Sequence, residues 1–435
     1  MRTGIYLLVV LTAGAYLPSP LYPDYQRAFE ISDLAMTLLY ATFALVSAPV
    51  LLLFGSASDV LGARSVLRAG TLSAAVGSLC FAFAGDAAWL VAGRAAQGLA
   101  LGAATAAATA LISDNARGSS RSRATALAST AFLLGTAAGP VAAGVLAQYL
   151  WAPGCTPYLL HLLLLWFGWR RVSALRARIG TSRRLRPQRP RIPRGVRWSF
   201  AAAAMTGFLA WAVVGLFLAV VPALLDRAAQ VDTATTGFVL GAVLVCSASV
   251  QPLVVRVGVR SAQLAGLAGL FTSLVLLAST GGGSIPITLC AAVVAGAGHG
   301  LAYGGAAAAV EDIAPRTERG AVVGALYLAF YLGAGGPAIA VGLVALGSPL
   351  ETAMSWVTAV AGALVPVAAV AVVFARVPRG GPDPEAPSHG RSCARGRRGL
   401  LRGNRCPGGP RGGARAPRWP RSRRPRPAGD RSRPS

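Results

Sequence analysis

Charged residues are so unevenly spaced in this chain that they leave uncharged runs long enough to cross a membrane. Runs of this kind cover residues 3–23, 34–58, 198–225, 233–255, 320–350 and 352–375. A helix of about 20 residues spans the roughly 30 Å hydrocarbon core of a bilayer. Two further runs, 124–169 and 261–310, are about twice that length and hold turn signals near their centres. With residues 66–85 and 87–112, the count is twelve spans.

Composition supports the same fold class. Hydrophobic residues make up 54% of the 435 positions and charged residues only 13%, which is not the composition of a soluble protein. We therefore predict an all-α, polytopic membrane protein with twelve transmembrane helices. The six cysteines form no CxxC or Cys/His pattern, so we expect free thiols and no metal site.

No lysine occurs in the sequence, and all 41 basic residues are therefore arginine. A Walker phosphate loop and a pyridoxal phosphate Schiff base both require a lysine. The sequence also contains no HExxH zinc motif and no GxSxG nucleophile elbow. We expect no cofactor and no enzymatic activity.

The arginine positions predict the orientation, because cytoplasmic loops of membrane proteins are rich in basic residues. Every predicted loop on the side of the N-terminus holds arginine, whereas only Arg27 and Arg227 fall on the other side. We expect both termini to be cytoplasmic and the chain to lie in the cell membrane. A cleaved signal peptide ending near Ala13–Ala15 is the alternative, but it would leave eleven spans and disrupt this partition.

The charge pattern also divides the chain into four parts. Residues 1–169 and 198–375 hold six predicted spans each, residues 170–197 form a linker, and residues 376–435 form a tail. The linker holds eleven arginines and no acid, and we expect it to lie against anionic membrane lipids rather than to bind nucleic acid. The tail holds 17 arginines among proline and glycine, and we expect it to be disordered.

The two halves repeat each other. Gly98–Gly102 (GLALG) recurs at Gly300–Gly304 (GLAYG), and Gly139-Pro140 recurs at Gly336-Pro337. The offsets of 202 and 197 residues agree closely enough to indicate two six-helix pseudo-repeats. Two such bundles facing each other across a cavity can expose it to the two sides of a membrane in turn.

The loop between the second and third spans reads GSASDVLGARSVL at residues 55–67. Here the chain resembles the major facilitator superfamily, whose members carry glycine, aspartate, a second glycine and basic residues at this loop. The matching residues are Gly55, Asp59, Gly62 and Arg64. Val60 and Ala63 replace residues that are usually basic, and the second half repeats only Gly258 and Arg260 of the pattern.

Asp59 is predicted to act in conformational gating. A carboxylate can accept hydrogen bonds from exposed N–H groups at the N-terminus of a neighbouring helix, where the helix dipole also favours an anion. The resemblance implies that this partner is the start of the eleventh span near Gly320, and that the contact stabilises an outward-facing state. The alternative is a solvated loop carboxylate.

The fourth span contains RAAQG at Arg94–Gly98, which resembles the second signature of the superfamily. An arginine inside a span is functional by default, because its charge is costly in lipid. Spans four to six hold no acid, so we expect Arg94 to contact backbone carbonyls, water or Gln97. We predict a role in proton coupling or anionic substrate binding for these two residues; a structural salt bridge or snorkelling is the alternative.

The fifth span reads LLGTAAGPVAAG and is similar to the motif of the superfamily's proton-coupled exporters. The matching residues are Gly135, Gly139, Pro140 and Gly144, while Ala143 replaces a usual glycine. Small residues four apart let two helices approach closely, and a proline kinks a helix. The resemblance implies a hinge and a proton-tight seal, and ordinary close packing is the alternative.

Three further positions are candidates for coupling or substrate binding. Prolines at 18, 20 and 23 are expected to break the first helix near the outer mouth and to leave Tyr22 and Asp24 lining it. Asp24 is a candidate outer contact for a proton or cation, and a plain loop acid is the alternative. His299 takes the place of Gln97 in the repeat, and its titration range suits a proton carrier, although a packing role is the alternative. His161 lies in a leucine-rich stretch and is expected to face lipid.

Together these residues predict a secondary transporter of the major facilitator type. The resemblance implies proton-coupled efflux of a small amphipathic or drug-like solute by alternating access, and we expect a monomer. Proton-linked uptake of a small metabolite by the same fold is one alternative. A membrane receptor that moves no solute is another.

Overall fold

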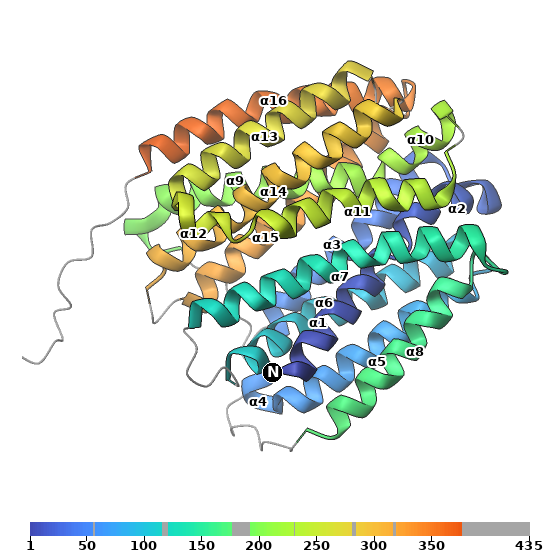
Figure 1. Ribbon diagram of the computed structural model, residues 1–435, viewed down its shortest axis with the longest axis horizontal. Helices are drawn as coiled ribbons and strands as arrows, with labels where there is room; N and C mark the ends of the chain where they lie inside the picture. Colours follow the sequence, from blue (N-terminus) through green and yellow to red (C-terminus); the bar gives the residue numbers. More distant parts are fainter. Residues whose placement is uncertain are drawn as a thin grey trace, which may run out of the picture. The chain divides into compact units, whose positions relative to one another are not determined.

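The computed structural model describes residues 1–54, 57–114, 121–175, 192–229, 231–280, 284–315 and 319–375, and within them every regular element is a helix (Figure 1). The first half contains α1 (Arg2–Tyr16), η1 (Ser19–Leu21), α2 (Tyr22–Phe29), α3 (Asp33–Phe54), α4 (Ala57–Leu61), α5 (Ala63–Ala82), α6 (Ala87–Asp114), α7 (Arg121–Tyr149) and α8 (Thr156–Ser173). The second half contains η2 (Arg194–Val196), α9 (Arg197–Ala219), α10 (Val221–Ala229), α11 (Thr233–Val250), α12 (Leu253–Val257), α13 (Val259–Thr280), α14 (Ile285–Ile313), α15 (Arg319–Val344) and α16 (Leu350–Phe374).

Twelve of these helices are long. In the described part of the chain, eleven helical segments have the length and apolar composition needed to cross a membrane. The twelfth long helix, α8, has 18 residues and is more polar, because it contains His161, Arg170 and Arg171. It packs beside α1, α5 and α7. The predicted all-α architecture of twelve long helices is confirmed.

The first helix ends where prolines prevent its continuation. α1 stops at Tyr16, η1 adds one tight turn, and α2 begins at Tyr22 with Pro23 in its first turn. The second half repeats this break, because α9 ends at Ala219 and α10 follows with Pro222 at its second position. A proline has no backbone N–H, so the carbonyl four residues earlier loses its helical donor.

The loops after α3 and α11 show the internal repeat in the backbone itself. Each contains a five-residue helix, α4 or α12, followed by a glycine with positive φ. The φ angles are 80° at Gly62 and 85° at Gly258, and no other glycine in the described ranges has a positive φ. With ψ at 142° and 153°, both residues occupy a region that is essentially limited to glycine.

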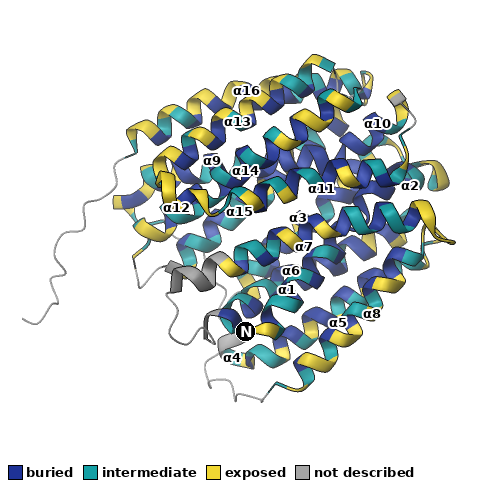
Figure 2. Cartoon of the chain, viewed as in Figure 1, coloured by how far each residue is buried: buried dark blue, intermediate teal, exposed yellow. Residues whose placement is uncertain are grey.

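Burial follows the position of a helix in the bundle. α9 is buried on all sides from Leu209 to Ala219, as expected of a core helix that is apolar all round. Figure 2 shows exposed positions along α16 and α5, and these include Trp356, which is 64% exposed, and Leu72, which is 58% exposed. Large apolar side chains exposed on outer helices indicate a surface that faces lipid.

Helices of the two halves meet in two equivalent pairs. α7 packs against α11, and α15 packs against α3 (Figure 1). Within each half, α1 packs against α7, and α9 packs against α15. Matching α1 with α9, α3 with α11, and α7 with α15 converts each of these contacts into its counterpart. The structure therefore has the pseudo-twofold relation that the sequence repeat predicts.

The expectation that His161 faces lipid is wrong. Only 2% of this residue is exposed, and its Nδ1 and Nε2 lie 2.7 Å from Ser78 Oγ and 3.0 Å from Val10 O. The ring occupies the space left by Gly14, where a Cβ would collide with it. Leucines beside it, such as Leu163, face outward instead and are exposed.

Gly258→Ala should lower the free energy of unfolding by about 1 to 3 kcal/mol, because the backbone conformation at this residue strains any side chain. Space is not the obstacle, since no atom lies within 4 Å of a Cβ built there. Gly336→Ala is the matched control, because that site is equally open and lies inside α15, where alanine favours the helix. Thermal unfolding in detergent measures both, and equal melting temperatures for the two variants would contradict the assignment.

Candidate functional site

A cavity of about 350 Å³ lies between the two halves. Its walls come from α1, α3, α6 and α7 of the first half and from α9, α14 and α15 of the second. It reaches Leu52 at the end of α3, Glu311 at the end of α14 and Gly320 at the start of α15. These helix ends lie on the side of the bundle where α1 begins. We call this side of the bundle the arginine-rich end, because the arginines of the N-terminal turns of α5 and α13 lie there.

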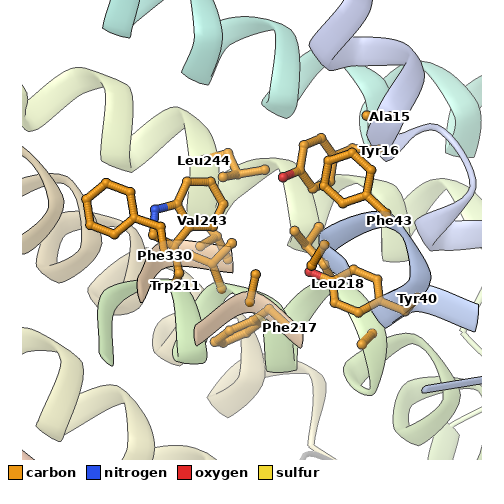
Figure 3. Packing of buried hydrophobic residues seen from close by; sticks show 14 of the residues in the cluster. Ala15, Tyr16, Tyr40, Phe43, Trp211, Phe217, Leu218, Val243, Leu244 and Phe330 are labelled. Atoms are coloured by element: carbon orange, nitrogen blue, oxygen red, sulfur yellow. The ribbon is translucent and has the colours of Figure 1, made fainter. Parts of the chain in front are cut away.

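Aromatic rings from both halves line the cavity. They belong to Tyr16, Phe43, Phe132, Trp211, Tyr303, Tyr327, Phe330 and Tyr331. Several of the rings touch: the centroids of Trp211 and Tyr303 are 5.9 Å apart, and those of Tyr303 and Phe330 are 5.2 Å apart. Figure 3 shows Trp211 beside Phe330, and Tyr16 beside Phe43. Aromatic rings in mutual contact thus form part of the wall.

The polar groups of the cavity are mostly hydroxyls and carry no positive charge. Thr105, Thr109 and Ser129 contribute aliphatic hydroxyl groups, the four lining tyrosines contribute phenolic ones, and Glu311 contributes a carboxylate. No arginine or histidine occurs among the described lining residues, and Arg94 in particular is not part of the wall. Such a surface suits an apolar, aromatic or cationic solute better than an anion.

Glycines close the opposite end of the bundle by bringing backbones of the two halves together. A Cβ at Gly144 in α7 would lie 2.5 Å from the Thr233 carbonyl oxygen and 3.1 Å from the Cα of Gly237 in α11. The equivalent contact joins α15 to α3, where a Cβ at Gly342 would lie 3.0 Å from Leu34 Cα. At Gly144 the neighbouring atoms are backbone and cannot move aside cheaply, and at Gly342 the Thr37 hydroxyl lies closer still than the Leu34 backbone. We call these two close contacts the seal, and a sealing role in transport stays a prediction.

The start of α11 is held firmly at this seal. Asp232 caps the helix, since its carboxylate accepts hydrogen bonds from the Thr235 N–H at 2.8 Å and the Thr235 hydroxyl at 2.7 Å. The hydrogen bond from the Thr235 backbone, together with the one from its side chain, holds the pKa of Asp232 below its usual value. The Thr233 N–H donates across the halves to Gln148 Oε1 at 3.2 Å.

Two ion pairs also join the halves at the opposite end. Arg27 Nη1 lies 2.6 Å from Asp226, and Arg227 Nη2 lies 2.5 Å from Asp33. Asp24 pairs with Arg27 at 2.5 Å, and its role at the outer mouth stays a prediction. The two arginines that the sequence places outside are therefore the ones that bridge the halves there. They bridge reciprocally, each from its own half to an acid of the other.

Arg94 and Gln97 hydrogen-bond to the broken end of α1. Pro18 cannot donate to the Gly14 carbonyl, and Gln97 Nε2 donates to that oxygen at 2.9 Å instead. Arg94 Nη1 donates to the Ala15 carbonyl at 2.5 Å and to Gln97 Oε1 at 3.1 Å. The last carbonyls of a helix form the negative end of its dipole, which also favours the arginine charge. The expected contacts of Arg94 with carbonyls and Gln97 are present, and its functional role stays a prediction.

The rest of the Arg94 guanidinium lies in an aromatic box. Its central carbon is 5.4 Å from the ring centroid of Tyr22, 5.8 Å from that of Tyr40 and 5.9 Å from that of Phe81. Nε and Nη2 have no hydrogen-bond partner, and neither has the Tyr22 hydroxyl. Tyr22 is fully buried in this box, whereas the sequence predicted that it lines the outer mouth.

The glycines of the fifth span contact two different helices. Cβ atoms at Gly135 and Gly139 would collide with the α1 backbone, whereas Gly144 faces α11 of the other half. Pro140 lies between these positions inside α7, and its carbonyl oxygen is 2.5 Å from a Cβ built at Gly237. Close packing of this segment is observed. The hinge and seal roles in transport stay predictions.

His299 lies behind the cavity wall rather than in it. The side chain is fully buried, its Nδ1 lies 2.7 Å from Ser247 Oγ, and its Nε2 has no hydrogen-bond partner. Its ring stacks on Tyr303 and meets Trp211 edge to face. The two candidates that the repeat equates, Gln97 and His299, therefore lie in different chemical environments.

The residues of the first motif lie at the arginine-rich end. Asp59 belongs to α4, but its side chain and the whole of Gly55 lie outside the described residues. Gly62 makes the positive-φ turn into α5, and the Nε of Arg64 is buried without a hydrogen-bond partner. The gating contact of Asp59 stays a prediction.

Sequence reasoning missed the aromatic wall and the acids of the ion pairs. Tyr327, Phe330 and Tyr331 are three or four residues apart, which places them on one helix face, and this spacing was a usable signal. Asp33 and Asp226 gave no such signal, because the acid that pairs with each arginine lies almost 200 residues away in the chain.

Gln97→Leu should lower the free energy of unfolding by about 1 to 3 kcal/mol, because it leaves the buried Gly14 carbonyl without a donor and removes a partner of Arg94. Gln263→Leu in α13 is the control, since Gln263 is also buried but its Oε1 has no hydrogen-bond partner. Thermal unfolding in detergent compares them. An equal loss in both variants would show that Gln97 contributes no more than an ordinary buried amide.

Two curated proteins match parts of this sequence. A segment of 181 residues is 35% identical to the class C tetracycline resistance protein of Escherichia coli. This match covers 39% of this chain and 45% of that protein. A segment of 135 residues is 28% identical to YybF of Bacillus subtilis (strain 168), an uncharacterized MFS-type transporter, and covers 31% of this chain and 33% of YybF. The matched region thus spans less than half the length of either relative.

Solved transporter structures share the fold at low sequence identity. A POT family transporter in complex with 5-aminolevulinic acid superposes with a TM-score of 0.67 at 11% identity, covering 86% of this chain and 96% of that one. A bacterial homolog of the human lysosomal transporter Spinster, solved in an inward-facing and occupied conformation, gives 0.63 at 15% identity and covers 86% and 95%.

A family model matches the chain twice, over residues 5–335 and again over residues 203–421. The first match alone includes the walls of the cavity, the break in α1 and the Gly144 contact of the seal. The second begins inside α9, in the second half of the repeat. This membrane protein therefore belongs to the Major Facilitator Superfamily, a family of transporters rather than enzymes.

Proposed function

We propose that this protein exports a small amphipathic or drug-like organic solute in exchange for protons, by alternating access. The arginine-rich end is cytoplasmic in this proposal, and the chain works as a monomer in the cell membrane. The single observation that carries the proposal is the cavity between the halves, which reaches the arginine-rich end and is sealed at the other. That arrangement corresponds to an inward-facing state.

The repeat explains how the same chain reaches the outward-facing state. Contacts that seal the opposite end occur in symmetric pairs, at Gly144 with α11 and at Gly342 with α3. Rocking of one half against the other opens both together, because each is the counterpart of the other. Residues 1–169 and 198–375 would be the two moving bodies. Residues 170–197 would link them along anionic lipids, and we assign no role to residues 376–435.

The cavity supports an organic solute of moderate size. A volume of about 350 Å³ lies in the range of ligand pockets, roughly 300 to 1,000 Å³, and aromatic walls with few polar groups are typical of such pockets. Export rather than uptake is supported by the glycines and proline of α7 and by the named activity of the Escherichia coli relative, which is tetracycline resistance. Substrate and direction are both part of the proposal.

Each sequence candidate has a place in this cycle. Asp59, with Gly55, Gly62 and Arg64, would stabilise the outward-facing state at the arginine-rich end. Arg94 and Gln97 would hold the bend of α1 and link it to α6. Gly135, Gly139 and Pro140 would let α1 and α7 move together, with Gly144 as part of the seal. Tyr22 would support Arg94, and Asp24 would act through its pair with Arg27.

Membrane vesicles of opposite orientation test the direction of transport. We expect everted vesicles with an acidic interior to accumulate ethidium, tetraphenylphosphonium or tetracycline, and nigericin to abolish this by collapsing the pH gradient. Vesicles without the protein are the control. Accumulation in right-side-out vesicles driven by an acidic exterior would establish uptake. Binding of a probe without net movement in either orientation would establish a receptor.

Asp33→Asn with Asp226→Asn should shift the protein away from the state that is sealed at the opposite end. Each exposed pair contributes about 0.5 kcal/mol, so the loss of both changes the population ratio roughly fivefold. Spin labels at Gly85 and Gly347, two exposed loop positions of that end, report the separation of the halves by electron–electron resonance. Glu351→Gln, in the first turn of α16, is the control, because it removes a carboxylate that belongs to neither pair. An unchanged distance distribution in the double variant would rule out the ion pairs as a latch.

A further inference from the structure

His299 lies in the middle of α14, behind two rings that face the cavity. Its ring is parallel to that of Tyr303, with 5.4 Å between centroids and 5° between planes. Trp211 from α9 meets the same ring edge to face, with centroids 5.0 Å apart. Both Tyr303 and Trp211 line the cavity, whereas His299 is fully buried. One layer of aromatic rings therefore separates the imidazole from a solute.

The imidazole has one bonded and one unbonded nitrogen. Nδ1 lies 2.7 Å from the Ser247 hydroxyl of α11, and Nε2 has no hydrogen-bond partner although it is inaccessible to solvent. The indole N–H of Trp211 is in the same condition. His161 in the first half differs, because both of its ring nitrogens have partners. A buried nitrogen without a partner costs free energy and calls for a functional explanation.

Among the described residues, no carboxylate lies close enough to pair with an imidazolium at His299. Titratable groups on the helices packed around His299 are Cys246 on α11, Cys290 and Tyr303 on α14, and Tyr327 and Tyr331 on α15. The acids of α14, Glu311 and Asp312, are twelve and thirteen residues further along the helix, which is about 18 Å or more at 1.5 Å per residue. Arg197 and Arg260 are the charged residues of α9 and α13, and both lie near the ends of those helices. Buried without a counter-charge, the imidazole is neutral in this conformation.

We propose that His299 binds the exchanged proton, and that the imidazolium and a cationic organic substrate exclude each other because both depend on the rings of Tyr303 and Trp211. This rests on the proposed function and adds to it the proton carrier and the charge of the substrate. A cation in the cavity is attracted to the faces of these rings, as in aromatic cages that recognise quaternary ammonium groups. An imidazolium behind the same rings takes up that attraction from the other side.

The proton balance of the exchange is simple. In the outward-facing state, Nε2 takes a proton from water through its free lone pair, and the ring becomes imidazolium without any other bond change. In the inward-facing state, the proton leaves to water at the arginine-rich end, and the neutral ring allows an organic cation into the cavity. One proton enters for each monovalent cation that leaves. The structure, with neutral His299 and a cavity reaching the arginine-rich end, corresponds to the stage after proton release.

The size of the mutual exclusion follows from Coulomb's law. A cation within about 6 Å of the far face of Tyr303 is roughly 11 Å from the His299 ring. At an effective dielectric constant of about 20, two unit charges at that distance weaken each other's binding about tenfold. An effect of this size is large enough to couple the two fluxes and small enough to be reversible.

Binding of tetraphenylphosphonium to the purified full-length protein tests the proposal. We expect the affinity to fall about tenfold between pH 8 and pH 5. A tenfold coupling shifts the titration of the ring by one pH unit, so about half a proton should be released per cation bound in weakly buffered solution at the midpoint pH. His299→Gln should still bind the cation, with an affinity that does not change with pH and with no proton release. His161→Gln is the matched control, a second buried histidine of the bundle, and should keep both the pH dependence and the proton release.

A second variant covers the case in which His299→Gln does not fold. Ser247→Ala keeps the histidine but removes the partner of Nδ1. A charged ring donates a stronger hydrogen bond to that hydroxyl than a neutral ring forms with it, so its loss should lower the pH midpoint of cation binding. An unchanged midpoint would contradict a titrating His299. Monodisperse elution and a melting temperature near that of the unmodified protein serve as the folding check.

The outcomes separate this proposal from the proposed function. If the cation binds with pH-independent affinity, or if His299→Gln still releases a proton, the assignment of His299 fails while export remains open. If no cation binds at any pH but vesicles still transport a neutral or anionic probe, the substrate charge inferred here is wrong. If vesicles transport nothing in either direction, the proposed function itself fails.

Discussion

Inside a membrane every backbone N–H and C=O must find its partner within the protein, and the break in α1 is where this requirement is most severe. Pro18 removes the donor of the Gly14 carbonyl, and Gln97 of α6 supplies another at 2.9 Å. Arg94 does the same for Ala15 and places its charge at the negative end of α1, among three rings. A helix break and a buried arginine, each unfavourable alone, stabilise each other beside the cavity.

The contacts between the two halves occur in equivalent pairs, because the chain is an internal duplication. The α7 and α11 backbones meet at Gly144, and the α15 and α3 backbones meet at Gly342. Arg27 and Arg227 reach reciprocally across the same end of the bundle. Each of these contacts therefore has a counterpart in the other half. The side chains at equivalent positions of the two halves differ, however. His299, behind the aromatic wall, occupies the position in the second half that corresponds to Gln97 in the first.

Much of the candidate site could be predicted from local sequence, and the rest could not. Arg94 was expected to meet backbone carbonyls, water or Gln97, because spans four to six contain no acid, and the structure shows it bonded to the Ala15 carbonyl and to Gln97. His161 could not be placed by composition, because a leucine-rich helix has one face toward lipid and another toward the core, and Ser78 and Val10 hold the ring on the inner face. The face that a polar residue occupies is decided by its partners on other helices.

Sequence alone determined the number of long helices, the membrane-spanning class and the internal repeat. These follow from short-range physics: charges cannot remain in hydrocarbon, prolines end helices, and glycine alone takes the backbone shape of Gly62 and Gly258. Only the tertiary structure decided that Trp211, Tyr303 and Phe330 form one wall, that Asp226 pairs with Arg27, and which end is sealed. Those contacts join residues that are far apart in the chain, and no local pattern specifies which helix faces lie against each other.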